Sequence, residues 1–246
     1  MADDGKRRWK GPDKKSEKGD SGRRTGERKV TAYRAKSESS KKWIERQLSD
    51  PYVQKAKSEG YRARAAYKLL EINDKTGFLR GGIRVVDLGC APGGWLQVCL
   101  KKGAKEVVGI DLLEVDPVAG AHIVMGDVNN PDDVAAMMDG LTGPPDLVLS
   151  DMAANTTGHR QTDHLRTAAL ADMALHFAQS YLPQGGTFCS KVFQGGATPD
   201  MMARLKDSFK SVKHIKPPSS RTGSPEIFVV ASGFRGKRPV ATDDGT

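Results

Sequence analysis

The clearest structural signal in the sequence is Val85-Val86-Asp87-Leu88-Gly89-Cys90-Ala91-Pro92-Gly93-Gly94-Trp95. It begins as a short apolar run, breaks at glycine, and continues into residues 96–100, which have helical spacing. This pattern predicts a strand, a tight glycine turn and the start of a helix. Because glycine has no Cβ, such a turn lets a ligand approach the backbone N–H groups closely. A turn without any ligand stays open as the alternative for the glycines alone.

The order of these glycines argues against two common nucleotide sites. It reads Gly-x-x-x-Gly-Gly, whereas a dinucleotide-binding turn reads Gly-x-Gly-x-x-Gly and a P-loop ends in Gly-Lys followed by Ser or Thr. A ligand at this turn is therefore expected to be recognised in another way.

Predicted strands and helices alternate along the chain. Strands are expected over 83–88, 106–111, 121–125, 146–151, 186–193, 212–215 and 227–232, and helices over 94–102, 133–138, 165–181 and 200–209. Such alternation predicts an α/β fold, with a mostly parallel sheet covered by helices on both faces. The last two strands have no helix between them, so we expect them to form an antiparallel pair at one edge of the sheet.

The positive charge of this 246-residue chain, +9 in all, lies mostly at its beginning. Residues 1–42 carry 15 Lys and Arg against 7 Asp and Glu, a net +8, and the remaining 24 and 23 give +1. We expect a disordered basic tail over 1–40, one folded domain over 41–235 and a flexible tail over 236–246. The basic tail is either a solvated segment or an arm drawn to nucleic-acid phosphates.

A helical pattern before the glycine stretch mixes basic and aromatic side chains. Arg62, Arg64 and Lys68 lie close in sequence to Tyr61 and Tyr67. Basic and aromatic groups together suit a flipped-out or single-stranded nucleotide, so the three basic residues are candidate RNA contacts. A solvated helix face remains the alternative.

The cysteines and the hydropathy pattern limit the class of protein. Cys90, Cys99 and Cys189 are odd in number, widely spaced and without a Cys-x-x-Cys pair, so we expect buried thiols and neither a disulfide nor a metal site. No run of 18 apolar residues occurs. We therefore expect a cytoplasmic protein that does not enter the membrane.

Acidic residues follow several predicted strands at their carboxyl ends. Asp111, Asp127 and Asp151 each lie at such an end, and Asp87 lies within the first strand. In sheets of this kind the ligand binds beyond the carboxyl ends of the strands. Carboxylates there suit ribose hydroxyls, an adenine amino group and a cation, as in S-adenosylmethionine, better than they suit phosphates. Each aspartate alone could also be a turn or capping residue.

Four blocks of the sequence resemble the FtsJ-type ribosomal RNA 2′-O-methyltransferases. They are Asp87-Leu-Gly-Cys-Ala-Pro-Gly-Gly-Trp95, Ser150-Asp-Met-Ala153, Lys191-Val-Phe-Gln-Gly195, and Ser219-Ser-Arg221 followed by Glu226. The similarity runs over about residues 62–233 and is strongest to the bacterial branch. One departure is Ala154, where the family commonly has proline after Asp-Met-Ala.

The resemblance implies a Rossmann-like class I methyltransferase, with a seven-stranded sheet that carries an antiparallel edge strand. It implies a catalytic tetrad of Lys68, Asp151, Lys191 and Glu226. It also implies that S-adenosylmethionine contacts Gly93, Trp95, Asp111, Asp127 and Asp151. The substrate it implies is a uridine 2′-hydroxyl in 23S rRNA of the large ribosomal subunit. We expect a monomer that needs no metal.

A ribose hydroxyl is a weak nucleophile, so the reaction needs alignment and removal of a proton. Lys191 is the candidate base. A free lysine is protonated at neutral pH, so the site must favour its neutral form. Burial and a second ammonium at Lys68 act in that direction, whereas Asp151 opposes them. Asp151 and Glu226 are expected to orient the two lysines.

Methylation of an mRNA cap is disfavoured because the sequence shows no cap-binding appendage, and three alternatives remain open. The acceptor could be transfer RNA, or the chain could be a ribosome assembly factor that binds RNA without catalysis. A complete tetrad argues against the second of these. A methyltransferase of small molecules is the third, and the basic residues Arg62 and Arg64 beside Lys68 argue against it.

Overall fold

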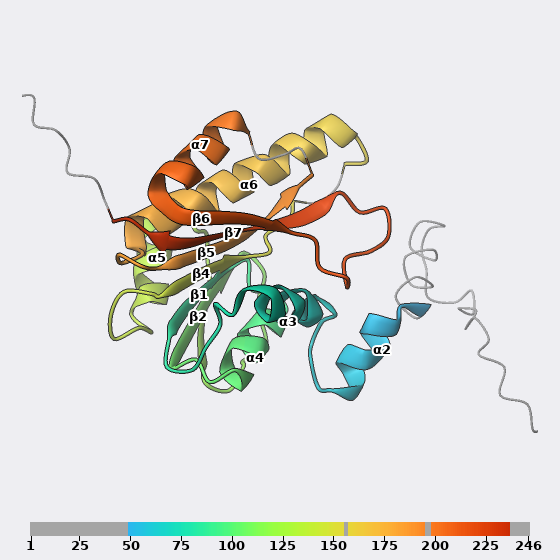
Figure 1. Ribbon diagram of the computed structural model, residues 1–246. Helices are drawn as coiled ribbons and strands as arrows, with labels where there is room; N and C mark the ends of the chain where they lie inside the picture. Colours follow the sequence, from blue (N-terminus) through green and yellow to red (C-terminus); the bar gives the residue numbers. More distant parts are fainter. Residues whose placement is uncertain (1–48, 155–156, 195–197, 237–246) are drawn as a thin grey trace, which may run out of the picture. The chain divides into compact units, whose positions relative to one another are not determined.

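The computed structural model describes residues 49–154, 157–194 and 198–236. They form a seven-stranded sheet in the order β3-β2-β1-β4-β5-β7-β6 (Figure 1). The strands are β1 (Arg84–Leu88), β2 (Glu106–Asp111), β3 (Ala121–Met125), β4 (Leu147–Ser150), β5 (Thr187–Phe193), β6 (Phe209–Ile215) and β7 (Glu226–Phe234). The helices are α2 (Pro51–Ser58), α3 (Ala65–Thr76), α4 (Gly94–Lys101), α5 (Pro131–Met138), α6 (Arg160–Tyr181) and α7 (Pro199–Ser208).

The predicted α/β architecture is confirmed, including the edge pair formed by the last two strands. Strands β1 to β5 pair in parallel, whereas β7 pairs antiparallel with both β5 and β6. The strand that runs against the others is therefore β7, one place in from the edge, and β6 forms the edge itself. Strand order reverses between β1 and β4, which is where a doubly wound sheet binds its ligand.

Two apolar cores lie on opposite faces of the sheet. Helices α5, α6 and α7 cover one face, where Leu175, Met137 and Leu205 pack on the strands. Helices α3 and α4 cover the other, where Leu69 and Leu96 are fully buried (Figure 1). The strands of the central sheet are buried on both sides, as their continuous apolar sequences predict.

The helix α6 begins five residues before the apolar pattern that predicts it. Its first turn, from Arg160, is polar, and His159 caps it by accepting a hydrogen bond from the backbone N–H of Thr162. A polar first turn has no apolar periodicity, so the sequence pattern marks only the later turns.

The three cysteines are free and buried, as expected. No helix in the described parts of the chain has the length and apolar character needed to cross a lipid bilayer. The predicted tails over 1–40 and 236–246, and the start of the predicted domain at 41, fall almost entirely outside the described residues.

Candidate active site

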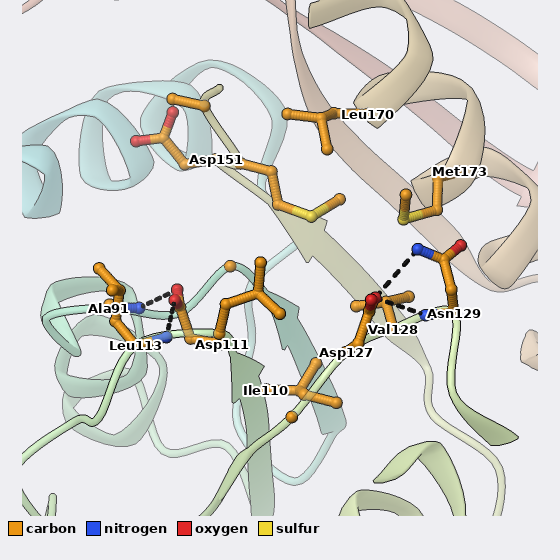
Figure 2. A pocket seen from close by; sticks show the side chains of 15 residues that line it. Ala91, Ile110, Asp111, Leu113, Asp127, Val128, Asn129, Asp151, Leu170 and Met173 are labelled. Atoms are coloured by element: carbon orange, nitrogen blue, oxygen red, sulfur yellow. Dashed lines mark hydrogen bonds between the residues drawn. The ribbon is translucent and has the colours of Figure 1, made fainter. Parts of the chain in front are cut away.

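A pocket of about 410 Å³ opens at the carboxyl ends of the central strands (Figure 2). Loops after β1, β2, β3 and β4 form its walls, and α6 closes one side with Leu170 and Met173. Its lining combines carboxylates with aliphatic side chains, namely Asp111, Asp127, Asp151, Ile110, Leu112, Leu113, Val128 and Met152. The volume lies in the range of sites for small molecules and cofactors.

Two of the predicted cofactor aspartates are fixed by backbone N–H groups. The Asp111 carboxylate accepts hydrogen bonds from the N–H of Ala91 and of Leu113, both at 2.9 Å. Asp127 accepts from the backbone and side-chain nitrogens of Asn129, again at 2.9 Å. Figure 2 shows both carboxylates held at the pocket wall in this way. Carboxylate oxygens have further lone pairs, so each can still accept a bond from a ligand.

The glycine turn allows close approach of other chain segments. Gly89 has a φ of +78°, and a Cβ there would lie 2.4 Å from Cγ of Met152 in the pocket wall. Gly93 has a φ of +101°, and its Cβ would meet Val118 at 2.9 Å and Arg62 at 3.0 Å. Both positions need glycine because of conformation and space.

Asp87 is a buried carboxylate with no partner among the described residues. It is 1% exposed, and neither oxygen has a hydrogen bond. Burial raises its pKa well above the usual value, and the charges of Asp151 and Asp111 act in the same direction. It lines a cavity of about 40 Å³ that adjoins the larger pocket at Gly89 and Ala91. Such an unpaired buried acid fits a bound cation, which the sulfonium and ammonium groups of S-adenosylmethionine would supply.

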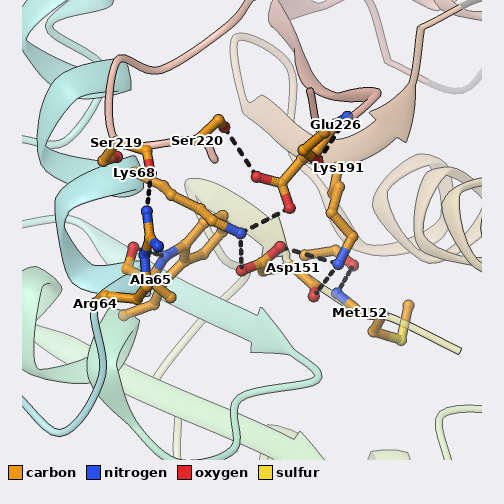
Figure 3. Close-up of polar contacts among 12 residues, drawn as sticks. Arg64, Ala65, Lys68, Asp151, Met152, Lys191, Ser219, Ser220 and Glu226 are labelled. Atoms are coloured by element: carbon orange, nitrogen blue, oxygen red, sulfur yellow. Dashed lines mark hydrogen bonds and ion pairs between the residues drawn. The ribbon is translucent and has the colours of Figure 1, made fainter. Parts of the chain in front are cut away.

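Next to this pocket the structure brings together four charged side chains from four different elements (Figure 3). Lys68 of α3 lies with its Nζ 2.8 Å from Glu226 Oε2 and 3.3 Å from Asp151 Oδ2. Lys191 of β5 has its Nζ 3.1 Å from Asp151 Oδ1, and donates a 2.8 Å hydrogen bond to the Asp151 carbonyl. Asp151 also lines the acidic pocket, so the four residues and the pocket form one site.

The charges in this cluster decide its protonation. Burial lowers the pKa of Lys68, but the charges of Asp151 and Glu226 and hydrogen bonds to both outweigh it, so the net pKa is raised. Burial raises the pKa of Asp151, but Lys68 and Lys191 outweigh it, so the net pKa is lowered. Lys68 therefore stays an ammonium and Asp151 a carboxylate at neutral pH.

Comparison with known proteins agrees with this geometry. The FtsJ-like methyltransferase model matches residues 61–234, which include the glycine turn, the pocket and all four charged residues. The chain belongs to the FtsJ-like methyltransferase family. A ribosomal RNA large subunit methyltransferase E from Hyphomonas neptunium is 69% identical over 96% of this chain and 100% of its own length. A protein with the same description from Gluconobacter oxydans is 53% identical over 86% of this chain and 79% of its own.

Among solved structures, a protein from Plasmodium falciparum described as a ribosomal RNA methyltransferase is similar. It is 34% identical and has a TM-score of 0.64, over 72% of this chain and 100% of that one. The enzyme class expected from the sequence, a methyltransferase of Rossmann-like fold, is therefore confirmed.

In this FtsJ-like methyltransferase, the loop between β6 and β7 is tied to α3. The backbone N–H and the hydroxyl of Ser219 donate to Glu71 at 2.7 and 2.6 Å, and Arg64 donates to the Ser219 carbonyl. The neighbouring Ser220 donates to Glu226 Oε1 at 2.9 Å. The loop thereby fixes Glu226 against Lys68.

The predicted RNA contacts Arg62 and Arg64 have partners within the protein. The Arg62 guanidinium donates to the carbonyls of Pro92, Asp116 and Pro117, which ties the start of α3 to the loop after β2. Arg64 pairs with Asp50 and binds the loop before β7. The sequence shows that a cationic side chain is present, but it does not show which carbonyl groups accept the hydrogen bonds of that side chain.

Two predicted cofactor contacts lie away from the larger pocket. Trp95 is buried, donates from its Nε1 to the Ala65 carbonyl at 2.8 Å, and lines the small cavity beside Asp87. Gly93 is not in the lining of either cavity, and a Cβ added at this position would meet Arg62 and Val118.

Sequence reasoning missed the apolar side of the pocket and the residues that support Glu226. Leu112 and Leu113 are 72% and 67% exposed, directly after Asp111. Two adjacent leucines directly after an acid at a strand end are a sequence signal that could have predicted an apolar wall of the ligand pocket. Ser220 gives no such signal, because a serine in a polar loop is ordinary.

Proposed function

We propose that this protein transfers a methyl group from S-adenosylmethionine to the ribose 2′-hydroxyl of a uridine in 23S rRNA. The acceptor would be RNA of the large ribosomal subunit in the cytoplasm, and the protein would act as a monomer without a metal. The observation that carries the proposal is the position of Asp151, which lines the acidic pocket and pairs with both lysines. The relatives described as large subunit methyltransferases support the choice of RNA.

The pocket fits S-adenosylmethionine. Asp111 and Asp127 offer carboxylates for ribose hydroxyls and the adenine amino group, and Leu112, Val128 and Met173 offer apolar surface to a ring. A positive charge in the adjoining cavity would favour the ionised form of Asp87, which would then compensate that charge; Trp95 and Gly94 also line this cavity. When bound, the cofactor supplies an electrophilic methyl group. In this proposal Gly93 does not contact the cofactor but allows the tight turn between β1 and α4. Arg62 holds the loop after β2 beside that turn.

The two lysines have different tasks in this mechanism. Lys68 stays charged because two carboxylates compensate it, so it cannot take a proton from the acceptor and instead attracts the RNA ribose or phosphate. Lys191 is the remaining lysine and acts as the general base from its neutral form, which it reaches by releasing its proton to solvent before methyl transfer. It is buried and points at Asp151, which lines the cofactor pocket.

The proton path follows from these contacts. The 2′-hydroxyl proton would pass to neutral Lys191 Nζ as the ribose oxygen bonds to the methyl carbon and becomes a methyl ether. The bond between that carbon and the sulfonium sulfur would break, leaving a neutral thioether. The new ammonium charge is stabilised by Asp151 Oδ1 and by the Asp151 carbonyl, which already lie at 3.1 and 2.8 Å from Nζ. Glu226 holds Lys68 in place and Asp151 orients both lysines, so all four members act as one unit.

Methyl transfer from labelled S-adenosylmethionine tests the proposal, with large subunits, free ribosomal RNA and transfer RNA offered in parallel. A 2′-O-methyl group blocks alkaline cleavage at the next phosphodiester, so label in alkali-resistant dinucleotides reports the ribose as the acceptor. Label in transfer RNA alone, or in alkali-sensitive mononucleotides, would contradict the proposal.

A variant pair tests Lys191 as the base. Lys191→Arg keeps the positive charge but cannot accept a proton, because a guanidinium stays protonated. We expect methyl transfer to fall by about 10²- to 10⁴-fold, the usual contribution of a general base. Cofactor affinity should stay close to that of the unchanged protein. Lys101→Arg, on the exposed side of α4, is the matched control.

A further inference from the structure

Phe193 follows Lys191 by two residues in β5 and has no task in the mechanism above. Phe193 ends β5 and pairs directly with Glu226 of β7, and Lys191 pairs with Phe228. Side chains of directly opposed residues lie on the same face of a sheet, and so do residues two apart in a strand. Phe193 therefore follows Lys191 and lies opposite Glu226 in register, one step closer to the edge where ligands bind, and from this last position of β5 its ring reaches α6.

A second ring completes this feature. His164, in the first turns of α6, has its ring 5.9 Å from the Phe193 ring, with the planes tilted by 41°. Both side chains are half-buried, so each keeps part of its surface open to solvent. Phe188, earlier in the same strand, is fully buried in the core. Neither Phe193 nor His164 lines the cofactor pocket.

We propose that Phe193, backed by His164, is the surface on which the base of the acceptor nucleotide stacks. This inference rests on the proposed function, which places the ribose 2′-hydroxyl at Lys191. Residues two apart in a strand are about 6.6 Å apart, which matches the size of a nucleotide whose ribose lies at one residue and whose base lies at the other.

The chemistry of the two rings favours a base over other parts of RNA. Phosphates seek cations and N–H donors, and an uncharged phenyl ring offers neither. Every base has a π-face, and stacking on aromatic side chains is the common way in which unpaired bases are held. Stacking would also offset the cost of taking the nucleotide out of its helix.

The test compares ring and non-ring side chains at position 193. Phe193→Leu keeps apolar volume but removes the π-face, whereas Phe193→Tyr keeps the ring. Tyr181→Leu removes a ring that is 38% exposed at the far end of α6, away from the charged cluster, and serves as the matched control. The measurements are kcat and KM for the RNA at saturating cofactor, cofactor affinity, equilibrium RNA binding and thermal unfolding.

Phe193→Leu should raise KM for the RNA and weaken RNA binding by about 10- to 100-fold, the range of base–aromatic stacking. Cofactor affinity and unfolding temperature should stay unchanged. Phe193→Tyr and Tyr181→Leu should keep the KM and the RNA binding of the unchanged protein.

Two results would overturn the inference. One is Phe193→Leu with unchanged KM and RNA binding. The other is loss of cofactor affinity or unfolding temperature in step with activity, which would make Phe193 a packing residue. Failure of the unchanged protein to methylate any RNA is different. It would refute the proposed function, while the RNA-binding comparison would still decide whether Phe193 holds a base.

Discussion

Replacing Glu226 with glutamine removes one charge from the cluster while keeping the shape of the side chain. Glu226 Oε2 lies 2.8 Å from Lys68 Nζ, and both side chains are largely buried, 13% and 15% exposed. After the change Lys68 is left with Asp151 Oδ2, at 3.3 Å. Asp151 must then compensate both lysines alone.

The size of the effect follows from these distances. At an effective dielectric constant of about 20, the attraction across 2.8 Å is about 6 kcal/mol and across 3.3 Å about 5 kcal/mol. Breaking a buried pair costs about 3–5 kcal/mol once the desolvation of the ions is counted. Because Asp151 still pairs with Lys68, we expect the lower end, about 3 kcal/mol. For a unit of this size that lowers Tm by about 6–12 °C.

The assay is thermal and urea unfolding of Glu226→Gln, Lys68→Met and the double variant, with methyl transfer measured on each. If the pair is coupled, the double variant loses about 2 kcal/mol less than the sum of the single losses. Methyl transfer should fall about 10- to 100-fold in Glu226→Gln, because Lys68 is no longer held in place.

Ser220→Ala is the milder control. It removes only the 2.9 Å hydrogen bond to Glu226 and should cost about 1 kcal/mol. Full stability and activity of Glu226→Gln, or strict additivity in the double variant, would refute this account of the cluster.

Three further predictions concern the cofactor pocket, the loss of stability at low pH and the glycine turn. Asp111→Asn should weaken cofactor binding about 10- to 100-fold in a titration, since hydrogen bonds to a charged group are lost, while Glu114→Gln nearby should not. The carboxylate of Asp151, with its lowered pKa, contributes stability that is complete above its unfolded pKa and is lost as pH falls through the folded one. The free energy of unfolding of Asp151→Asn, measured in urea, should therefore fall less steeply below about pH 4 than that of the unchanged protein. Gly89→Ala, whose Cβ would lie 2.4 Å from Met152, should cost at least about 2 kcal/mol in urea unfolding and impair cofactor binding, whereas Gly185→Ala, also at positive φ but in open space, should cost only about 1–2 kcal/mol.

The fold could be predicted from the sequence because its signals are local. Strands β2 and β3 lie within the bounds that the apolar pattern predicts, and the glycine turn lies between β1 and α4 as expected. The sequence predicts the start of β6 three residues later than Phe209, because this edge strand buries only its two end residues and its exposed polar positions show no period of two.

The candidate active site could be predicted from the sequence only in part. The acids after the strands can be read from the sequence, because a strand end is a local property, and resemblance to a family added the four charged residues. The pairing of these residues follows from the packing of the folded chain. Lys68 and Glu226 are 158 positions apart, and their contact depends on how β7 inserts beside β5 and how α3 packs on the sheet.

The arginines of α3 show the same limit. Their charge is written in the sequence, but the carbonyls that bind Arg62 and the Asp50 that binds Arg64 come from other segments. Asp87 is the converse case, since an acid within a strand appears ordinary until burial leaves its carboxylate without a partner. Sequence fixes which groups a chain has, and packing decides which of them remain free to act, because hydrogen bonds and ion pairs depend on distances that only the folded chain sets.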